Sequence, residues 1–232
     1  MVSGVRLGVA SGVRLGIVAA LVAVLGFAGY IFASGWRPSP ARYPLQGVDL
    51  GDHPGAVGWG SIRAAGADFA YLVATTGSTQ RDPDFEANWA ALPEAGLRRG
   101  AIHLYSLCDD GVAQADAFNA TVPKTADALP PAVDIDLRDG CDPPAPGRAV
   151  TDNLRRFAAR VEAHVGKPVV LRLSRPAERR YGLSAALVRP LWLQGSFIRP
   201  DYATRPWTLW RATSWRRIDG VEGPVNWDVV AS

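Results

Sequence analysis

The hydrophobic pattern alternates between continuous apolar runs of strand length and stretches in which apolar residues recur at helical spacing. A continuous apolar run of about four to eight residues, bounded by turn residues, is typical of a strand that is buried on both faces. Eight such runs occur, and they predict strands over residues 46–50, 68–75, 99–107, 130–136, 169–173, 191–194, 207–213 and 225–230.

Segments with helical spacing follow each of the first five runs. In the clearest one, Val150, Leu154, Phe157 and Val161 line one side of a predicted helix that continues to Val165. The gaps after the sixth and seventh runs hold about a dozen residues each and are rich in Gly, Pro and Arg, which leaves little room for a crossover helix with its loops. The other predicted helices cover residues 57–65, 85–92, 112–122 and 177–187.

Five strand-helix units followed by three strands without helices predict a parallel sheet covered by helices, and eight strands suffice to close a barrel. The expected fold is an α/β, TIM-like barrel of the (β/α)5(β)3 type, formed as one domain by residues 44–232. Chemistry in such barrels lies at the carboxyl ends of the strands. Asp49, His103, Asp134 and Asp136 all fall at these ends.

The N-terminal region contains an apolar segment without charges at residues 16–33. Its length exceeds a usual signal-peptide core of about 7–15 residues and just reaches the length that a membrane-spanning helix needs. We therefore expect a cytoplasmic tail at 1–15, a transmembrane signal-anchor at 16–33 and a stiff linker at 34–43. Cleavage after Gly35, with Ala33 three residues before the cut, is the alternative.

Composition adds few constraints. The 232 residues carry a formal charge of +3, from 25 basic and 22 acidic side chains dispersed along the chain. No nucleic-acid-binding motif accompanies the paired arginines, so solvated surfaces explain them better than contacts with nucleic acid. No spacing of His, Cys, Asp or Glu indicates a metal site, and we expect no cofactor and a monomer.

Asp134 and Asp136 form a D-x-D motif at the end of the fourth predicted strand. Alternate residues of a strand share a face, which places their Cα atoms about 6.5–7 Å apart. Paired carboxyl groups at about 5–9.5 Å serve glycoside hydrolysis, with retention at the shorter and inversion at the longer separations. A capped strand end, a calcium loop and a metal-dependent sugar transferase are the alternatives, although Arg138 stands where a calcium ligand would be required.

The two cysteines, Cys108 and Cys141, each lie five residues beyond a polar residue near the end of consecutive predicted strands. Neighbouring parallel strands would bring the two loops together, so a disulfide is compatible with this placement. It would close a loop of about 30 residues and stabilise the fold by roughly 3–4 kcal/mol. A bridged pair predicts an oxidising compartment, whereas two buried thiols are the alternative.

Short motifs occur along the predicted barrel in an order and spacing that are specific together. The motifs are Gly47-Val48-Asp49-Leu50, Ala65-Gly66-Ala67-Asp68-Phe69-Ala70-Tyr71, Ala74-Thr75-Thr76-Gly77, Asp82-Pro83-Asp84-Phe85, Asn88-Trp89, residues 95–103, Gln114-Ala115 with Phe118, Leu129-Pro130-Pro131 before Asp134-Ile135-Asp136, Pro190-Leu191-Trp192, and Trp207 with Leu209-Trp210. With these motifs, residues 44–232 resemble the glycoside hydrolase family 25 lysozymes, also called Chalaropsis-type muramidases.

The resemblance implies a barrel of five strand-helix units plus three strands and cleavage of the N-acetylmuramic acid to N-acetylglucosamine bond of peptidoglycan, with retention. In the family pattern the fourth strand carries D-x-E, whose Glu donates a proton while its Asp assists. Carried over, Asp136 is the general acid, Asp134 the assisting carboxylate, and Asp49 holds the sugar or tunes its neighbours. The candidate substrate contacts are His103, Tyr71, Tyr105, Trp192, Trp210 and Asn226. A structural hydrogen-bonding role is the alternative for His103, and core packing is the alternative for the aromatic residues.

The chain departs from the family pattern at several positions. Asp136 is one methylene shorter than the Glu of the pattern, and misplacement by about 1 Å can lower a rate about a hundredfold. We therefore carry two hypotheses: a membrane-anchored hydrolase of reduced activity on the extracytoplasmic side, and an inactive member that binds wall glycan or a partner. The other departures are Val73 for Lys, Thr76 for Glu, Leu171 for Tyr, Arg211 for Gln and Asn226 for Asp.

Overall fold

The computed structural model describes residues 6–51, 57–137 and 147–231, and the side chains from residue 15 onward. The chain divides into two compact units, Met1–Trp36 and Arg37–Ser232. Each unit is described by itself below.

The first unit contains one helix, α1 (Arg6–Gly35), of 30 residues. Its segment Leu15–Gly35 has 21 residues and a mean hydropathy of 2.4, and it is long and apolar enough to cross a membrane. At about 1.5 Å per residue, this segment extends about 31 Å, close to the thickness of a bilayer's hydrocarbon core. The predicted span 16–33 falls inside it. Length and composition alone support a membrane role for α1.

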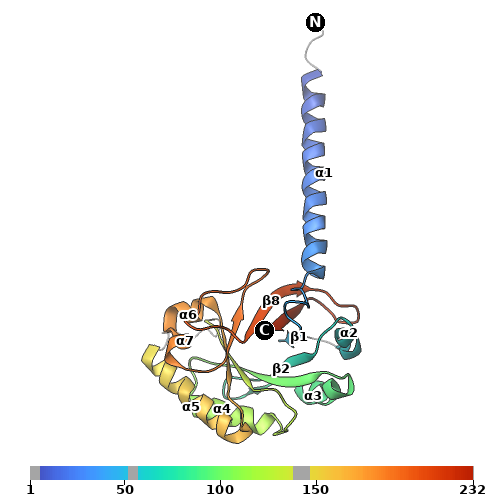
Figure 1. The fold of residues 1–232 in the computed structure, drawn as a ribbon. Helices are drawn as coiled ribbons and strands as arrows, with labels where there is room; N and C mark the ends of the chain where they lie inside the picture. The colour runs from blue at the N-terminus through green and yellow to red at the C-terminus, as the bar shows by residue number, and fades with distance from the viewer. Residues whose placement is uncertain (1–5, 52–56, 138–146, 232) are drawn as a thin grey trace. The chain divides into compact units, whose positions relative to one another are not determined.

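The second unit is a closed barrel (Figure 1). Eight of the nine strands in the described residues form it, and pairing of the first with the second closes the ring, which confirms the predicted fold. The short β3 pairs only with β2. The strands are β1 (Gln46–Leu50), β2 (Phe69–Thr76), β3 (Gln80–Arg81), β4 (Arg98–Leu104), β5 (Ala132–Ile135), β6 (Val170–Leu173), β7 (Leu191–Gln194), β8 (Leu209–Arg216) and β9 (Val225–Val230).

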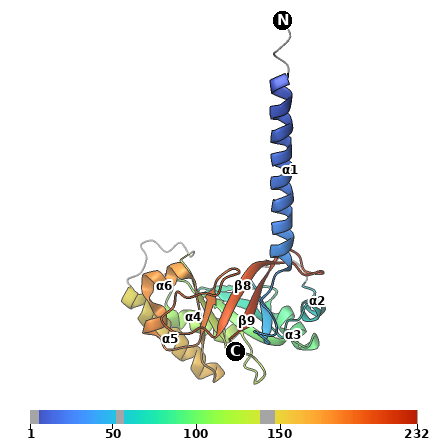
Figure 2. The same ribbon diagram turned by 45° about the horizontal axis from the view of Figure 1, so that its top comes forward.

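Helices pack around the outside of the first part of the barrel (Figure 2). Residues 195–208 and 217–224, which join the last three strands, contain none, as predicted. The strand β9 runs antiparallel to both β8 and β1, because the short connection 217–224 can only return the chain in the opposite direction. The helices are α2 (Trp59–Ala64), α3 (Phe85–Glu94), α4 (Gly111–Thr121), α5 (Gly147–Val165), α6 (Arg175–Tyr181) and α7 (Leu183–Ala186).

One predicted helix, 177–187, is two helices in the structure. Gly182 separates α6 from α7 and has a φ of 58°. A glycine in this left-handed conformation typically ends a helix, because it carries no Cβ that would be strained there. The backbone N–H of Gly182 closes α6 by donating to the carbonyl of Glu178 at 2.8 Å.

The barrel interior is filled by apolar side chains, so it is a packed core and not a channel. Polar side chains replace them towards the carboxyl ends of the parallel strands, where Asp49, Asp134 and Arg172 point inward. The apolar layer therefore lies beneath a polar mouth. The buried residues of the apolar layer are Phe69, Tyr71, Val73, Ile102, Ala132, Val170, Trp192 and Leu209.

Most of the predicted linker, 34–43, packs on the barrel. The guanidinium of Arg37 donates to the carbonyl of Ala65 at 2.9 Å, and the side chain of Gln46 donates to the carbonyl of Pro38 at 3.1 Å. The ring of Tyr43 is buried, with its centroid 5.9 Å from that of Trp210. The barrel unit therefore begins at Arg37.

Cys108 is disulfide-bonded in the structure. Its predicted partner, Cys141, lies outside the described residues, so the pairing of these two cysteines stays a prediction.

Candidate functional site

An arginine from β6 joins two of the predicted acids at the mouth of the barrel. Arg172 donates from Nη1 to Asp49 of β1 at 2.9 Å and from Nη2 to Asp134 of β5 at 2.7 Å. All three side chains are at most 6% exposed. The structure therefore brings together acids from the first and fourth strands of the parallel series, which lie far apart in the sequence.

Asp49 accepts further hydrogen bonds from the last two strands. Arg211 of β8 donates to both oxygens of Asp49, the bond from Nε being 2.8 Å long. Asn226 of β9 adds a bond of 3.1 Å to Oδ1. A carboxylate has about four lone-pair positions, so these bonds leave Asp49 little capacity for a sugar hydroxyl.

A third buried acid, Asp228 of β9, lies beside Asp49. Its Oδ1 accepts from the indole N–H of Trp192 at 2.9 Å. Burial, and secondly the charge of Asp49, raise the pKa of Asp228 well above its ordinary value. Burial also acts to raise the pKa of Asp49, but Arg211 and Arg172 outweigh it and lower that pKa. Asp228 is therefore the acid of this pair that binds a proton more readily, and its buried Oδ2 has no hydrogen-bond partner among the described residues.

The charges of this cluster balance. Asp49 and Asp134 form ion pairs with the guanidiniums of Arg172 and Arg211, and the raised pKa of Asp228 favours its neutral form. Burial alone would lower the pKa of Arg172, but Asp134 and Asp49 raise it above its ordinary value, so Arg172 stays charged. Buried charges persist in proteins when they are paired in this way. The barrel mouth is thus polar but electrically compensated.

Asp134 keeps one open acceptor. Its Oδ2 receives Arg172, while its buried Oδ1 has no hydrogen-bond partner among the described residues. A buried polar atom without a partner in a native structure calls for an explanation, and a ligand or a water is one. Asp136 follows β5 on the same face and is half-buried, and its Oδ1 accepts from the backbone N–H of Leu137 at 2.8 Å.

His103 does not face the barrel interior. It is fully buried, and its ring stacks on Phe157 of α5 with centroids 4.8 Å apart. Nε2 contacts Oε1 of Gln114 at 3.0 Å, and Nδ1 contacts the hydroxyl of Thr75 at 2.7 Å. Because the Gln114 oxygen only accepts, Nε2 carries the proton and Nδ1 accepts from Thr75. This position packs helices against the sheet and offers no surface to a substrate.

The predicted aromatic contacts divide between core and outer wall. Trp192 and Tyr71 lie inside the barrel with ring centroids 4.9 Å apart, and the Tyr71 hydroxyl donates to the carbonyl of Pro130 at 2.9 Å. Tyr105 packs outside the barrel against Phe157. Trp210 also lies outside, and its indole N–H donates to a backbone carbonyl. Of the four, only Trp192 touches the charged cluster, through Asp228 and Arg172.

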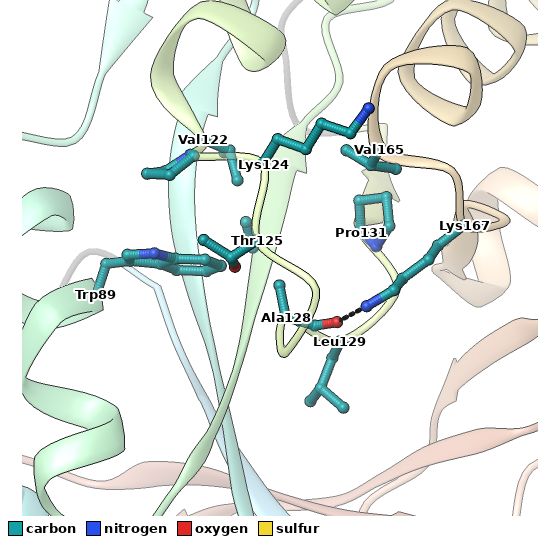
Figure 3. Close-up of a pocket in the computed structure, with 11 residues that line it drawn as sticks. Trp89, Val122, Lys124, Thr125, Ala128, Leu129, Pro131, Val165 and Lys167 are labelled. Carbon is teal, nitrogen blue, oxygen red and sulfur yellow. Dashed lines mark hydrogen bonds between the residues drawn. The ribbon is translucent and has the colours of Figure 1, made fainter.

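A small cavity occurs at the opposite, amino-terminal end of β4 and β5 (Figure 3). Trp89 and Thr125 line one side of it, and Lys167 lies on the other and donates to the carbonyl of Ala128. The volume is only ≈ 20 Å³. That is space for about one water molecule and far below the roughly 300–1,000 Å³ of a ligand site. This cavity is therefore too small for a ligand, and the predicted acids gathered at the mouth are taken as the candidate site.

A sequence profile of the glycosyl hydrolases family 25 matches residues 48–221, which include the acids of β1 and β5. The chain belongs to glycosyl hydrolase family 25. Its match covers the barrel from β1 to the connection that precedes β9.

The chain is also similar to individual curated proteins. Lysozyme M1 of Streptomyces globisporus is 28% identical over 199 residues, which cover 78% of this chain and 66% of that protein. The protein YegX of Escherichia coli K12 is 28% identical over 218 residues, or 86% of this chain and 77% of that protein.

Two crystal structures match the barrel closely. A family 25 glycosyl hydrolase from Bacillus anthracis has a TM-score of 0.75 and 29% identity, covering 82% of this chain and 90% of that chain. A lysozyme from Streptomyces coelicolor has a TM-score of 0.69 and 26% identity, covering 81% and 92%. The family 25 barrel is thus present in this chain.

Sequence reasoning missed Arg172 and Asp228 as members of this charged cluster, and it named Arg211 only as a departure from the family pattern. Arg172 is the charged residue of an otherwise apolar strand, Val170-Leu171-Arg172-Leu173. A strand buried on both faces holds a charge only if a partner is present. This signal was available in the sequence, but it does not identify which acid is the partner.

Proposed function

We propose that the barrel is a glycosidase of the lysozyme type that cleaves the β-1,4 bond between N-acetylmuramic acid and N-acetylglucosamine in peptidoglycan, at a reduced rate. Membership in family 25 supports the reaction class. The observation that carries the proposal is the open oxygen of Asp134, whose other oxygen accepts from Arg172 and which stands two residues before the half-buried Asp136.

The residues take the following roles in this proposal. Asp136 donates a proton to the leaving glycosidic oxygen. The open Oδ1 of Asp134 accepts the N–H of the substrate's acetamido group, which orients the acetamido oxygen towards the anomeric carbon as an internal nucleophile. Water then opens that intermediate and restores the configuration. Asp49, which is saturated by its hydrogen bonds, positions Arg172 and hence Asp134.

Two features support a reduced rate. Asp136 reaches about 1.5 Å less far than a glutamate, and an error of about 1 Å in position can cost about a hundredfold. The arginines also remove the negative potential that clustered carboxylates create, and this potential is what keeps a general acid protonated near neutral pH. Arg172 and Arg211 neutralise both Asp49 and Asp134.

The same compensation favours a second function, in which the barrel binds wall glycan without cleaving it. Arg172 bridges the assisting carboxylate and Asp49 through bonds of 2.7 and 2.9 Å. A carboxylate held in a buried ion pair is not free to change partners during a reaction cycle. In this form the mouth would be a preorganised polar surface for glycan hydroxyl and amide groups.

We further propose that α1 anchors the barrel on the extracytoplasmic side of a membrane and that the protein is a monomer. The apolar span Leu15–Gly35 and the wall-directed chemistry of the family support this placement. The disulfide at Cys108 is consistent with an oxidising compartment.

Zymography of the full chain on peptidoglycan tests these functions. Cleared zones that disappear in Asp136→Asn, but persist in the exposed control Arg148→Gln, support the glycosidase. If neither the parent chain nor the Asp136→Glu variant clears the gel, while both sediment with insoluble peptidoglycan, the binding function replaces it. No clearing and no sedimentation would exclude both.

A further inference from the structure

The barrel is attached to α1 by a very short connection. The helix ends at Gly35, and Arg37 is already held on the barrel through its bond to Ala65. Only Trp36 stands between them, and one extended residue spans at most about 3.5 Å. Pro38 and Tyr43 are also held on the barrel, so the barrel unit begins directly after the apolar segment in the sequence.

The end of β8 lies beside Arg37, the first residue of the barrel unit. The guanidiniums of Arg37 and Arg216 both lie over the ring of Trp227, at 5.7 and 4.2 Å from its centroid. Burial, and secondly repulsion by the charge of Arg37, lower the pKa of Arg216 to about 10. The two cations are therefore neighbours, although 179 positions separate them in the sequence.

The side chains next to this pair are exposed and of the kind found at membrane surfaces. Trp215 is 55% exposed, and Arg217 and Arg42 are exposed as well. Tryptophan and arginine combine an apolar body with a polar or charged end, which suits the headgroup region of a bilayer. Asp219 and Glu222 follow on the same connection, so the net charge of the surface is positive but moderate.

We propose that the tether surface, formed by Arg37, Arg42, Trp215, Arg216 and Arg217, docks on the headgroups of a bilayer that contains anionic phospholipid. This inference rests on the proposed membrane anchor. The indole of Trp215 enters the interface while the arginines face lipid phosphates. The barrel is thereby held flat against the membrane, and its substrate is the glycan closest to the bilayer, such as newly made strands.

Spin labelling of the full chain in lipid nanodiscs tests the docked orientation. One label is attached at Trp215→Cys, where the apolar nitroxide replaces the indole, and another at Val188→Cys, which is 73% exposed in the loop before β7. In phosphatidylglycerol-containing discs, we expect the label at 215 to be protected from a water-soluble relaxing agent. The label at 188 is expected to remain accessible.

A charge substitution separates docking from simple proximity. Each basic residue near an anionic surface contributes about fivefold to binding, so Arg217→Glu should shift the docked-to-free ratio by about 25-fold. Arg148→Glu makes the same charge change on α5, where the side chain is 96% exposed, and should have no effect. Discs of phosphatidylcholine alone should reproduce the effect of Arg217→Glu.

The outcomes distinguish the surface from the anchor. Recovery of the chain in the disc fraction with equal accessibility at 215 and 188 would overturn the docking surface and leave the anchor intact. Failure of the chain to enter discs would overturn the anchor, and the docking surface with it. Circular dichroism confirms that each labelled variant is folded.

Discussion

Two buried polar networks in this barrel solve the same problem in opposite ways. At the mouth, the buried acids Asp49 and Asp134 are paired with arginines, Arg172 with both and Arg211 with Asp49. Behind β4, His103 is equally buried, but burial lowers its pKa and keeps its ring neutral, and both ring nitrogens are hydrogen-bonded, to Gln114 and Thr75.

This difference distinguishes a site that can perform chemistry from a network that only supports the fold. A site with buried charges can act on a polar ligand, but each of its buried charges needs a partner of opposite charge. A neutral network such as that of His103 fixes α4 and α5 against the sheet and has no such requirement. Sequence position alone does not distinguish them, because His103 and Asp134 both lie near the ends of neighbouring parallel strands.

The largest expected effect is the loss of Arg172. Arg172→Met keeps the apolar stem over Trp192 but removes the charge shared by Asp49 and Asp134. Breaking a buried pair from one side costs about 3–5 kcal/mol, since it leaves buried charge uncompensated. Urea denaturation should show this loss, whereas the exposed control Arg148→Met should be unchanged. A stable Arg172→Met protein would mean that the mouth is open to water.

The pH dependence of stability should separate the two networks. Burial lowers the pKa of His103 to about 4, from an ordinary value of 6.5. The folded protein accommodates only the neutral ring of His103. The contribution of His103 to the free energy of unfolding is therefore complete above about pH 6.5 and falls by about 3 kcal/mol as the pH drops to about 4.

His103→Gln should remove that slope. The pKa of Asp49 is lowered in the fold, so its contribution is present above the ordinary 3.8 and is lost only at lower pH. Thermal denaturation at several pH values measures both windows. If stability depends on pH in the same way in His103→Gln, other groups cause the change between about pH 4 and 6.5.

Lengthening the side chain of the proposed acid at position 136 should have the next largest effect. Asp136→Glu adds one methylene and should raise peptidoglycan cleavage by up to about a hundredfold if position alone limits the rate. Release of new reducing ends measures it, with Asp136→Asn as the inactive reference. An unchanged rate would identify the arginine compensation, and not reach, as the limiting feature.

The smallest effect distinguishes two neighbouring acids. Asp228→Asn mimics the protonated carboxyl, still accepts from Trp192 and still donates towards Asp49, so its stability should change by less than about 0.5 kcal/mol. The same change at Asp49 removes the charge that pairs with Arg172 and Arg211 and should be far more costly. Equal losses in the two variants would show that Asp228 is ionised as well.

The repeated alternation of apolar runs and helical stretches allowed the barrel, and the helix-free region after β6, to be predicted from the sequence. Strand boundaries such as 191–194 and 225–230 agree with β7 and β9. The direction of β9 and the break at Gly182 were not anticipated, because both depend on local backbone geometry at the end of a segment and not on the hydrophobic period.

The amino-acid sequence by itself determined the fold, the apolar N-terminal segment and the presence of acids at strand ends, because these follow from patterns along neighbouring residues. Only the tertiary structure decided that Arg172 joins Asp49 to Asp134, that His103 faces away from the mouth, and that Arg37 meets Arg216. The physical reason is that the partners of a buried charge come from strands that lie 38 to 162 residues apart in the sequence, and only closure of the barrel determines which of them are in contact.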